Sequence, residues 1–87
     1  MTNIKSDIVL VRLYAAARAA TGRSEISVSP KSAQEILVEI SGGDANTLGL
    51  FSRCSILIQG EQLHDRERLI SGGSEMDVLP PFAGGSR

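Results

Sequence analysis

The chain has 87 residues and a mass of 9.2 kDa, which is one small domain without room for a second core. Hydrophobic residues make up 41% and charged residues 22%, values typical of a folded globular chain that exclude disorder. The net charge of −1 does not suit binding to a nucleic-acid backbone. One cysteine excludes an intrachain disulfide, and with one histidine we expect neither a metal site nor a bound cofactor.

Nothing in the sequence predicts export or insertion into a membrane. The apolar runs are far shorter than the roughly 20 residues of a membrane-spanning helix. The polar start MTNIKSD does not resemble a signal peptide. We therefore expect a soluble domain in the cytoplasm.

Two strands and a short helix are predicted in the first third of the chain. Residues 7–14 contain alternating apolar side chains, which predict a strand with one buried face. The alanine-rich stretch 15–20 predicts a short helix that ends at Gly22. Residues 25–29 alternate again and predict a second strand. The side chains expected to face the core are Val9, Val11, Leu13, Ile26 and Val28.

The clearest helix begins after Ser32. Ser32 and Glu35 have the spacing of a capping box, in which each side chain bonds to a backbone N–H at the helix start. An apolar stripe follows at helical spacing, and Gly42-Gly43 supplies a left-handed end. The stripe consists of Ala33, Ile36, Leu37 and Ile40.

Residues 44–53 show no regular pattern, so we expect an irregular segment there. Its apolar side chains, Leu48, Leu50 and Phe51, should anchor it in the core. The nearly continuous apolar run at 55–59 predicts a strand in a central position.

The last third is predicted to end on a strand. We expect a short return segment at 62–63, one loose helical turn within 64–70 and a tight turn at Gly72-Gly73. Residues 75–79 alternate and predict the last strand, which Pro80-Pro81 ends because prolines cannot donate to a sheet ladder.

This order of elements predicts an α+β fold, with one main helix packed across a small mixed sheet of four to five strands. A hairpin, a helix and a return strand beside the first strand form the β-grasp layout that ubiquitin uses. We expect residues 1–79 to form a single β-grasp domain and residues 80–87 an extended C-terminal tail.

The side-chain groups of a self-contained enzyme are missing from the sequence. Cys54 and His64 could form a nucleophile pair, but we favour a half-buried cysteine and a solvated loop histidine. None of the glycine pairs belongs to a phosphate-binding loop. Four carboxylates alternate with arginines or apolar residues and predict a solvated face rather than an acid/base pair: Asp65, Glu67, Glu75 and Asp77.

The third glycine pair, Gly84-Gly85, lies in the C-terminal tail. Pro80 and Pro81 favour an extended backbone, Phe82 offers one aromatic anchor, and the side chains then shrink to Ala, Gly and Gly. The residues 80–85 can reach about 20 Å at roughly 3.3 Å each. Such a tail suits the threading of a terminus into another protein's active site, and it also fits an ordinary frayed terminus.

The ending Val78-Leu79-Pro80-Pro81-Phe82-Ala83-Gly84-Gly85 resembles that of the ubiquitin-like sulfur carriers. The resemblance is greatest to small subunits of molybdopterin synthases, with the carriers of the thiamine and cysteine pathways as relatives. It extends over nearly the whole chain, and further matching segments are Tyr14-Ala15-Ala16-Ala17-Arg18, Ile58-Gln59-Gly60-Glu61 and Ser71-Gly72-Gly73-Ser74-Glu75-Met76-Asp77-Val78.

The resemblance implies a mechanism for the tail. A separate E1-like enzyme would adenylate the Gly85 carboxylate with ATP, and a sulfur donor protein would convert it to a thiocarboxylate. In a molybdopterin synthase the thiocarboxylate gives its sulfur to a pterin precursor in the large subunit. Gly84 would let the backbone pass, while Pro80, Pro81 and Phe82 would direct and dock the tail. The catalytic side chains and the nucleotide site would then belong to these partners.

Ser86-Arg87 is a departure from the family, whose members typically end at the second glycine. While these residues remain, the Gly85 carboxyl group is held in a peptide bond and cannot be adenylated. Three explanations stay open: a peptidase trims the two residues, they were added to the natural chain, or the carrier role is lost. We favour the first two because the preceding motif is intact.

Two other functions remain open. The same glycine ending fits a ubiquitin-like modifier joined through Gly85 to lysines of target proteins, and the chain could also be a plain interaction domain. For docking of partners we expect an apolar patch on the exposed face of the sheet, with Leu10 and Leu57 as candidates, although ordinary core packing would explain them equally well.

Overall fold

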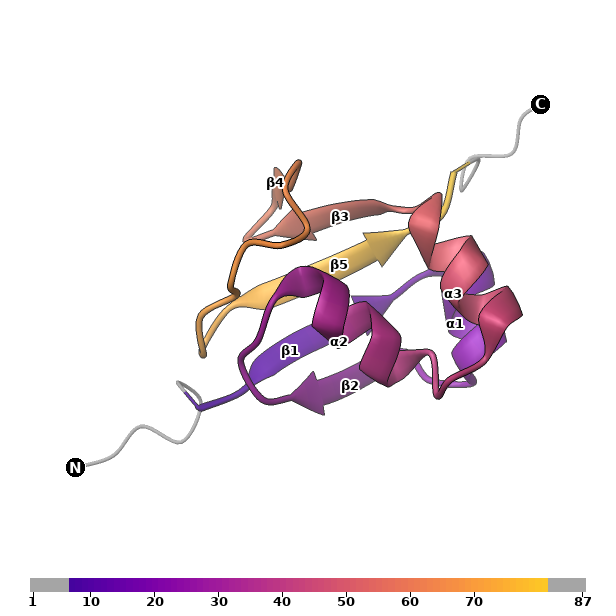
Figure 1. Cartoon of the computed structure of the whole chain (residues 1–87), viewed down its shortest axis with the longest axis horizontal. Coiled ribbons are helices and arrows are strands. Elements are labelled where there is room, and N and C mark those ends of the chain that lie inside the picture. Colours follow the sequence, from indigo (N-terminus) through magenta and orange to yellow (C-terminus); the bar gives the residue numbers. More distant parts are fainter. Residues whose placement is uncertain (1–6, 82–87) are drawn as a thin grey trace.

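A computed structural model describes residues 7–81. Five strands form one sheet in the order β2-β1-β5-β3-β4, in which β1 and β5 run parallel and the other neighbours antiparallel. Figure 1 shows these elements. They are β1 (Val9–Leu13), α1 (Ala15–Thr21), β2 (Glu25–Val28), α2 (Ala33–Ile40), α3 (Ala45–Ser52), β3 (Ser55–Ile58), β4 (Glu61–Gln62) and β5 (Glu75–Leu79). The predicted α+β fold with a mixed sheet is confirmed.

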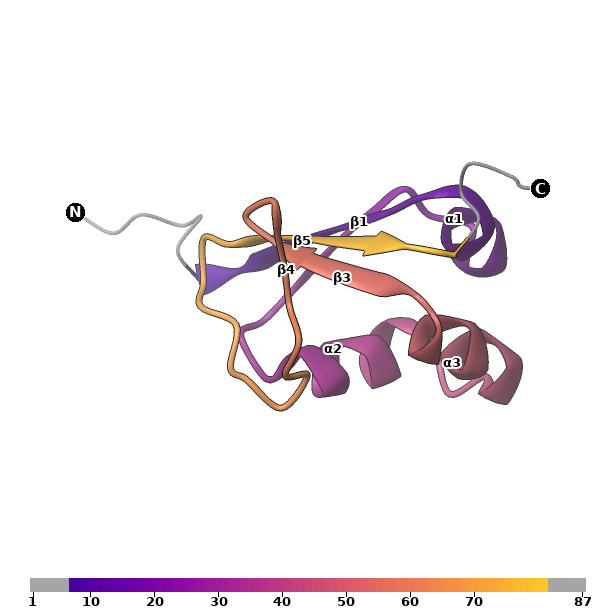
Figure 2. The same cartoon turned by 90° about the horizontal axis from the view of Figure 1, so that it is seen from above.

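The molecule has two layers. Figure 2 shows α2 and α3 together on one side of the sheet, while α1 lies at the end of the sheet where β5 finishes. We call the side under α2 and α3 the covered face and the opposite side the open face. Because side chains alternate along a strand, each strand contributes to both faces.

The covered face carries the core. Phe51 of α3, Met76 of β5 and Ile36 of α2 are all fully buried. Burying one such side chain contributes about 1.5–3 kcal/mol. The strand residues on the covered face, most of them predicted from the alternation, are Val9, Val11, Leu13, Val28, Ile56, Ile58, Met76 and Val78.

The capping box of α2 is present as predicted. The Glu35 N–H donates to Ser32 Oγ, and the Ser32 N–H donates to Glu35 Oε1, both over 3.1 Å. At the other end Gly42 and Gly43 have φ angles of 66° and 82°, in the left-handed region that favours glycine. The helix therefore begins and ends where the sequence indicated.

The prediction of an irregular segment over 44–53 was wrong, because α3 occupies most of it. Asp44 caps this helix: its Oδ2 accepts from the Thr47 N–H (2.8 Å) and from Thr47 Oγ1 (2.7 Å). Low intrinsic helix propensity at Asn46, Thr47 and Gly49 concealed the helix. Burial of Phe51 against the sheet overrides that local preference.

The segment 64–70 forms no helix, in contrast to the predicted helical turn. It makes a turn closed by the Arg68 N–H on Asp65 O (3.1 Å). Arg66 then fastens the segment to the end of α3, because its guanidinium donates to Phe51 O (2.9 Å) and to Cys54 O. The described helices are all too short to span a bilayer.

Candidate functional site

The candidate site begins where β5 ends. Pro80 is buried and Pro81 is exposed, so the last two described residues carry the chain from the sheet to the surface. The other residues of the predicted site, Phe82, Gly84 and Gly85, lie outside the described residues. The structure therefore shows the base of the tail, and the roles given to its end stay predictions.

The last residues of β5 are held from both sides. The Tyr14 N–H donates to Val78 O (3.3 Å), and Leu79 pairs with Ser55 at the start of β3. The Tyr14 hydroxyl also donates to Asp77 Oδ1 (3.3 Å). These contacts fix the position at which the chain leaves the sheet.

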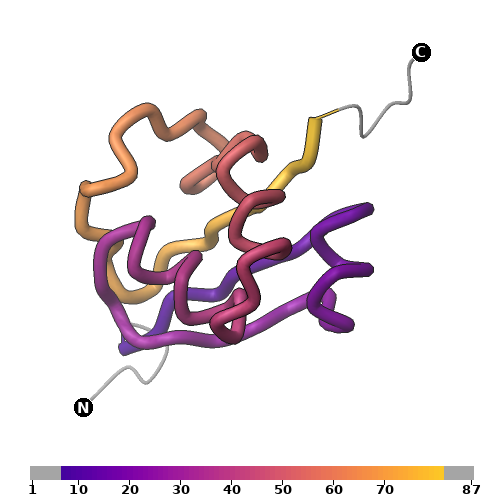
Figure 3. Tube along the Cα trace, turned by 45° about the vertical axis from the view of Figure 1, so that its right-hand side comes forward, coloured from indigo at the N-terminus to yellow at the C-terminus, as the bar shows by residue number. Residues whose placement is uncertain are grey.

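Helix α1 lies beside this exit. Ala15, its first residue, has a φ of 51°, a left-handed conformation that is costly for alanine. The sharp change of direction lets α1 pack against α3 while Tyr14 keeps its bond to β5. Figure 3 shows α1, α3 and the end of β5 at the same end of the molecule.

The open face extends from the exit along the sheet. It carries leucines on three strands, Leu10 on β1, Leu57 on β3 and Leu79 on β5, and all three are half-buried. The first two were the candidates for this face in the sequence, with core packing as the equal alternative. Leu79 was missed, although its spacing of two residues from Asp77 places it on the same face as that carboxylate.

Charged side chains stand between these leucines. Arg12 forms an ion pair with Glu75 (3.1 Å), and this carboxylate is the main reason that the pKa of Arg12 is raised. A hydrogen bond with Tyr14 and the charge of Asp77 act in the same direction. Glu25 lies directly opposite Arg12 in the register of β1 and β2. Among the strand residues that the structure describes, the open face thus carries the carboxylates of Glu25, Glu75 and Asp77 and the guanidinium of Arg12.

Three solved structures share the arrangement described above. Small archaeal modifier protein 1 from Methanosarcina acetivorans is 24% identical with a TM-score of 0.74, covering 90% of this chain and 96% of its own. The same modifier from Haloferax volcanii is 19% identical with a TM-score of 0.71 (90% and 99% covered). Subunit 1 of the molybdopterin-converting factor from Helicobacter pylori, in complex with subunit 2, is 17% identical with a TM-score of 0.64 (90% and 99%).

The chain has the ubiquitin-like β-grasp fold. The predicted resemblance to ubiquitin-like proteins is confirmed for the fold, which these modifiers and the molybdopterin-converting factor subunit share. Neither a protein-family model nor a curated protein sequence matches the chain. In this ubiquitin-like fold β5 lies between β1 and β3, so its end emerges from the middle of the sheet.

The ubiquitin-like domain has no activated thiol at Cys54. Its side chain is buried and its Sγ donates to Leu50 O (3.3 Å), whereas His64 is exposed. Burial raises the pKa of the Cys54 thiol, and the nearby Arg66 and Arg53 only partly oppose this. A raised pKa is the opposite of what a nucleophilic cysteine needs.

The four carboxylates named in the sequence lie in two separate places. Asp65 and Glu67 belong to the loop before β5, where Asp65 Oδ1 accepts from the Glu67 N–H (3.0 Å). Glu75 and Asp77 belong to the open face, where Arg12 and Tyr14 bind them. Over residues 7–81 no group of His, Cys, Asp and Glu side chains is arranged to hold a metal ion.

Proposed function

We propose that this protein is a sulfur carrier whose Gly85 carboxylate is converted to a thiocarboxylate, and that it serves as the small subunit of a molybdopterin synthase. One observation carries the proposal: a Pro-Pro-x-x-Gly-Gly segment directly follows the last strand of a ubiquitin-like domain. The buried Pro80 gives this segment a fixed base, and the small residues after Phe82 let it enter a narrow channel.

The chemistry proceeds at the Gly85 carboxyl group. The carboxylate attacks the α-phosphate of ATP on a separate adenylating enzyme, which forms an acyl adenylate and releases pyrophosphate. Hydrosulfide delivered by a sulfur donor protein then displaces AMP, loses its proton and leaves a thiocarboxylate. In this proposal the partner enzymes supply the acid and base groups for both steps, and the adenylating enzyme binds ATP.

The Gly85–Ser86 peptide bond must be hydrolysed before the first step, because an amide carbonyl cannot be adenylated in this way. We propose that a peptidase removes Ser86 and Arg87, unless they were added to the natural chain. The partners are then this peptidase, the adenylating enzyme, the sulfur donor protein and the large subunit, all in the cytoplasm. Support for the large subunit comes from the Helicobacter pylori neighbour, which forms a complex with subunit 2.

A second function, attachment to other proteins through Gly85, is supported by the two small archaeal modifier proteins among the neighbours. Both functions begin with adenylation of the same glycine. They differ in the nucleophile that attacks the activated Gly85 carbonyl, either in the acyl adenylate or in a thioester formed from it. This nucleophile is sulfide for a carrier and a lysine amine for a modifier. A carrier for thiamine or cysteine synthesis would share every step up to the thiocarboxylate.

A reconstituted reaction tests the proposal. The chain ending at Gly85 is incubated with the adenylating enzyme of its own organism, ATP and a sulfide source, and its intact mass is measured. We expect one oxygen to be replaced by sulfur, and the thiocarboxylate to sustain turnover by the large subunit.

Gly85→Ala is the test variant and Gly49→Ala the matched control. A Cβ at Gly49 in α3 meets no atom within 4 Å, so this control should fold and react normally. A methyl group at residue 85 should misplace the reacting carboxyl and lower sulfur transfer about a hundredfold. Unimpaired transfer by Gly85→Ala would contradict the mechanism.

A further inference from the structure

Lysine is rare in this chain, and arginine carries most of its positive charge. Seven arginines and the two lysines, Lys5 and Lys31, make up the nine basic residues. A guanidinium always keeps its charge, whereas the amine of a lysine becomes a nucleophile once it has lost a proton. Among residues 7–81, Lys31 is therefore the only side chain that carries an amine. The exposed arginines of the same range are Arg18, Arg23, Arg53 and Arg68.

The ammonium group of Lys31 is held by three acceptors. Its Nζ donates to Ser29 O (2.9 Å) and to Ser29 Oγ (2.8 Å), and it forms an ion pair with Glu39 Oε1 (2.8 Å). A lysine ammonium has three N–H donors, so these three oxygens match its full capacity. The Lys31 side chain is 25% exposed, in contrast to the exposed arginines. We call Ser29 and Glu39 the clasp.

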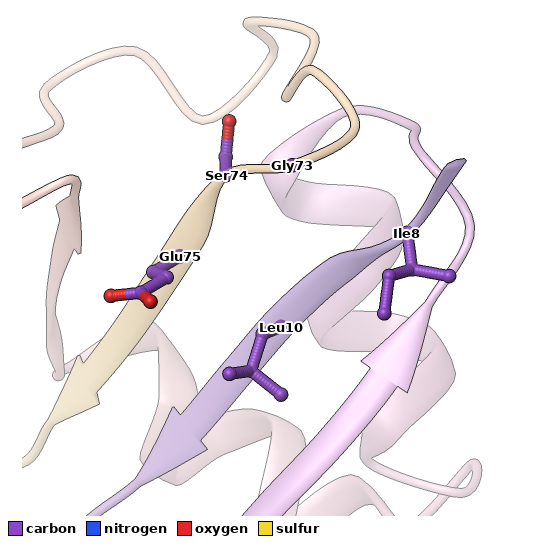
Figure 4. Close-up of a pocket in the computed structure, with 5 residues that line it drawn as sticks. All are labelled: Ile8, Leu10, Gly73, Ser74 and Glu75. Carbon is purple, nitrogen blue, oxygen red and sulfur yellow. The ribbon is translucent and has the colours of Figure 1, made fainter. Parts of the chain in front are cut away.

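The clasp lies at the end of the sheet away from the tail. Because β2 runs antiparallel to β1, the segment 29–31 that follows β2 lies where β1 and β5 start. Figure 4 shows the end of β2 beside Ile8, and the start of β5 at Ser74. The five residues of β5 separate that end from Pro80 by about 17 Å at roughly 3.4 Å each. A chain's own tail would need nearly its whole reach of about 20 Å to return to Lys31, so the tail of a second copy is better placed.

A free amine on the domain would compete with sulfide for an activated Gly85 carboxyl group. The nitrogen lone pair attacks the carbonyl carbon of the acyl adenylate, and a C–N bond forms. AMP leaves with the electrons of the broken C–O bond, and the nitrogen gives a proton to water. The product is an amide that joins two copies and cannot take up sulfur. Lys31 can enter this reaction only after it loses a proton and turns its lone pair away from the oxygens of the clasp.

We propose that the clasp protects the chain against acylation of Lys31 by the activated terminus of another copy. This rests on the proposed function, because only an activated Gly85 makes such protection necessary. With arginine at the exposed cationic positions and Lys31 in the clasp, the domain presents no reactive side-chain amine within residues 7–81. An ion pair near the surface contributes modestly, so the clasp should slow the reaction of Lys31 severalfold.

The reactivity of Lys31 is measured first without any partner. The chain is treated with the N-hydroxysuccinimide ester of acetic acid, and the acetylation of Lys31 is followed by peptide mass spectrometry. Ser29→Ala with Glu39→Gln removes two of the three acceptors and should raise the acetylation rate about fivefold, and Glu39→Gln alone about twofold. The matched control is Ser27→Ala with Glu61→Gln, which should leave the rate unchanged because Glu61 lies in β4, at the other edge of the sheet from β2.

Attachment between copies is then measured with the activating enzyme. The chain ending at Gly85, with Lys5→Arg so that Lys31 is its only lysine, is incubated with the adenylating enzyme of its own organism and ATP in the absence of sulfide. Peptide mass spectrometry counts the amides between Gly85 and Lys31. We expect about five times as many in the variant that lacks the Ser29 and Glu39 acceptors as in the chain with the intact clasp. Thermal melting of each variant confirms that it is folded.

The outcomes separate this proposal from the proposed function. If Lys31 is acetylated no faster in the clasp variants than in the control, the clasp gives no protection, and the carrier function stands on its own test. If the chain with the intact clasp joins Gly85 to Lys31 as often as the clasp variant does, Lys31 is an acceptor and the proposal is overturned. If the acetylation rates change as expected but Gly85 is never activated, the clasp controls the reactivity of Lys31, while its protective role falls together with the proposed function.

Discussion

The two faces of one sheet differ completely in this molecule. On the covered face β1, β2, β3 and β5 place apolar side chains beneath α2 and α3, and eight of these side chains are buried. On the open face the alternate positions of the same strands carry half-buried leucines among arginine and carboxylates. Neighbouring residues such as Val11 and Arg12 therefore belong to different environments.

This difference separates folding from function. The covered face supplies the apolar burial on which the stability of a small domain depends. The open face contributes little to that burial, so its residues can be chosen for binding partners. Substitutions on the covered face should accordingly lower the free energy of unfolding, whereas substitutions on the open face should leave it nearly unchanged. Three measurements of stability test this division.

Phe51→Ala should have the largest effect. Phe51 is fully buried beneath the sheet, and its truncation leaves a cavity that costs about 3–5 kcal/mol in the free energy of unfolding. The matched open-face change, Leu57→Ala, should cost about 1 kcal/mol or less because Leu57 is only half-buried. Urea denaturation of both variants measures the difference. Equal losses in the free energy of unfolding would contradict the proposed difference between the two faces.

Ser32→Ala should have an intermediate effect. The substitution removes the oxygen that accepts from the Glu35 N–H at the start of α2, at a cost of about 1 kcal/mol. Ser27→Ala is the control, since Ser27 is exposed on the open side of β2 and should change stability by less than about 0.5 kcal/mol. Thermal unfolding followed by circular dichroism compares the two serines. A larger loss for Ser27→Ala would contradict the assignment of α2 to the stabilising layer.

Asp44→Ala should have the smallest effect, and one that depends on pH. Hydrogen bonds from the Thr47 side chain and backbone lower the pKa of Asp44 below its ordinary value. The ionised carboxylate therefore stabilises the fold above the ordinary pKa of an aspartate, and this contribution is lost as pH falls through the lowered value. The stabilities of Asp44→Ala and the unaltered chain should differ at neutral pH and converge in acid. A constant difference across that range would show that the charge of Asp44 has no part in capping α3.

Much of the fold was predictable because local and tertiary signals agree. The alternation at Val9, Val11 and Leu13 gave β1, and the capping spacing at Ser32 and Glu35 gave the start of α2. Helix α3 was missed because Thr47 and Gly49 favour other conformations locally. Its signal was Asp44 as a capping residue, followed by apolar residues three apart at Leu48 and Phe51.

The candidate site was predictable only in part. The sequence alone indicated the Gly84-Gly85 ending and offered Leu10 and Leu57 as candidates for the exposed face, with core packing as the equal alternative. It could not indicate that Tyr14 holds both Asp77 and Val78, because these contacts join residues more than 60 positions apart. The open cavity between the starts of β1 and β5 likewise needs the parallel pairing of these strands, which brings Leu10 beside Glu75.

The intact mass of the protein isolated from its native host tests the central claim most directly. We expect a species that ends at Gly85 and is heavier by the difference between one sulfur and one oxygen atom. Gly85 remnants linked to lysines of other proteins would instead assign the chain to the modifiers. If the chain occurs only at full length, with Ser86 and Arg87 attached, the Gly85 carboxyl is never free and both proposed functions are contradicted.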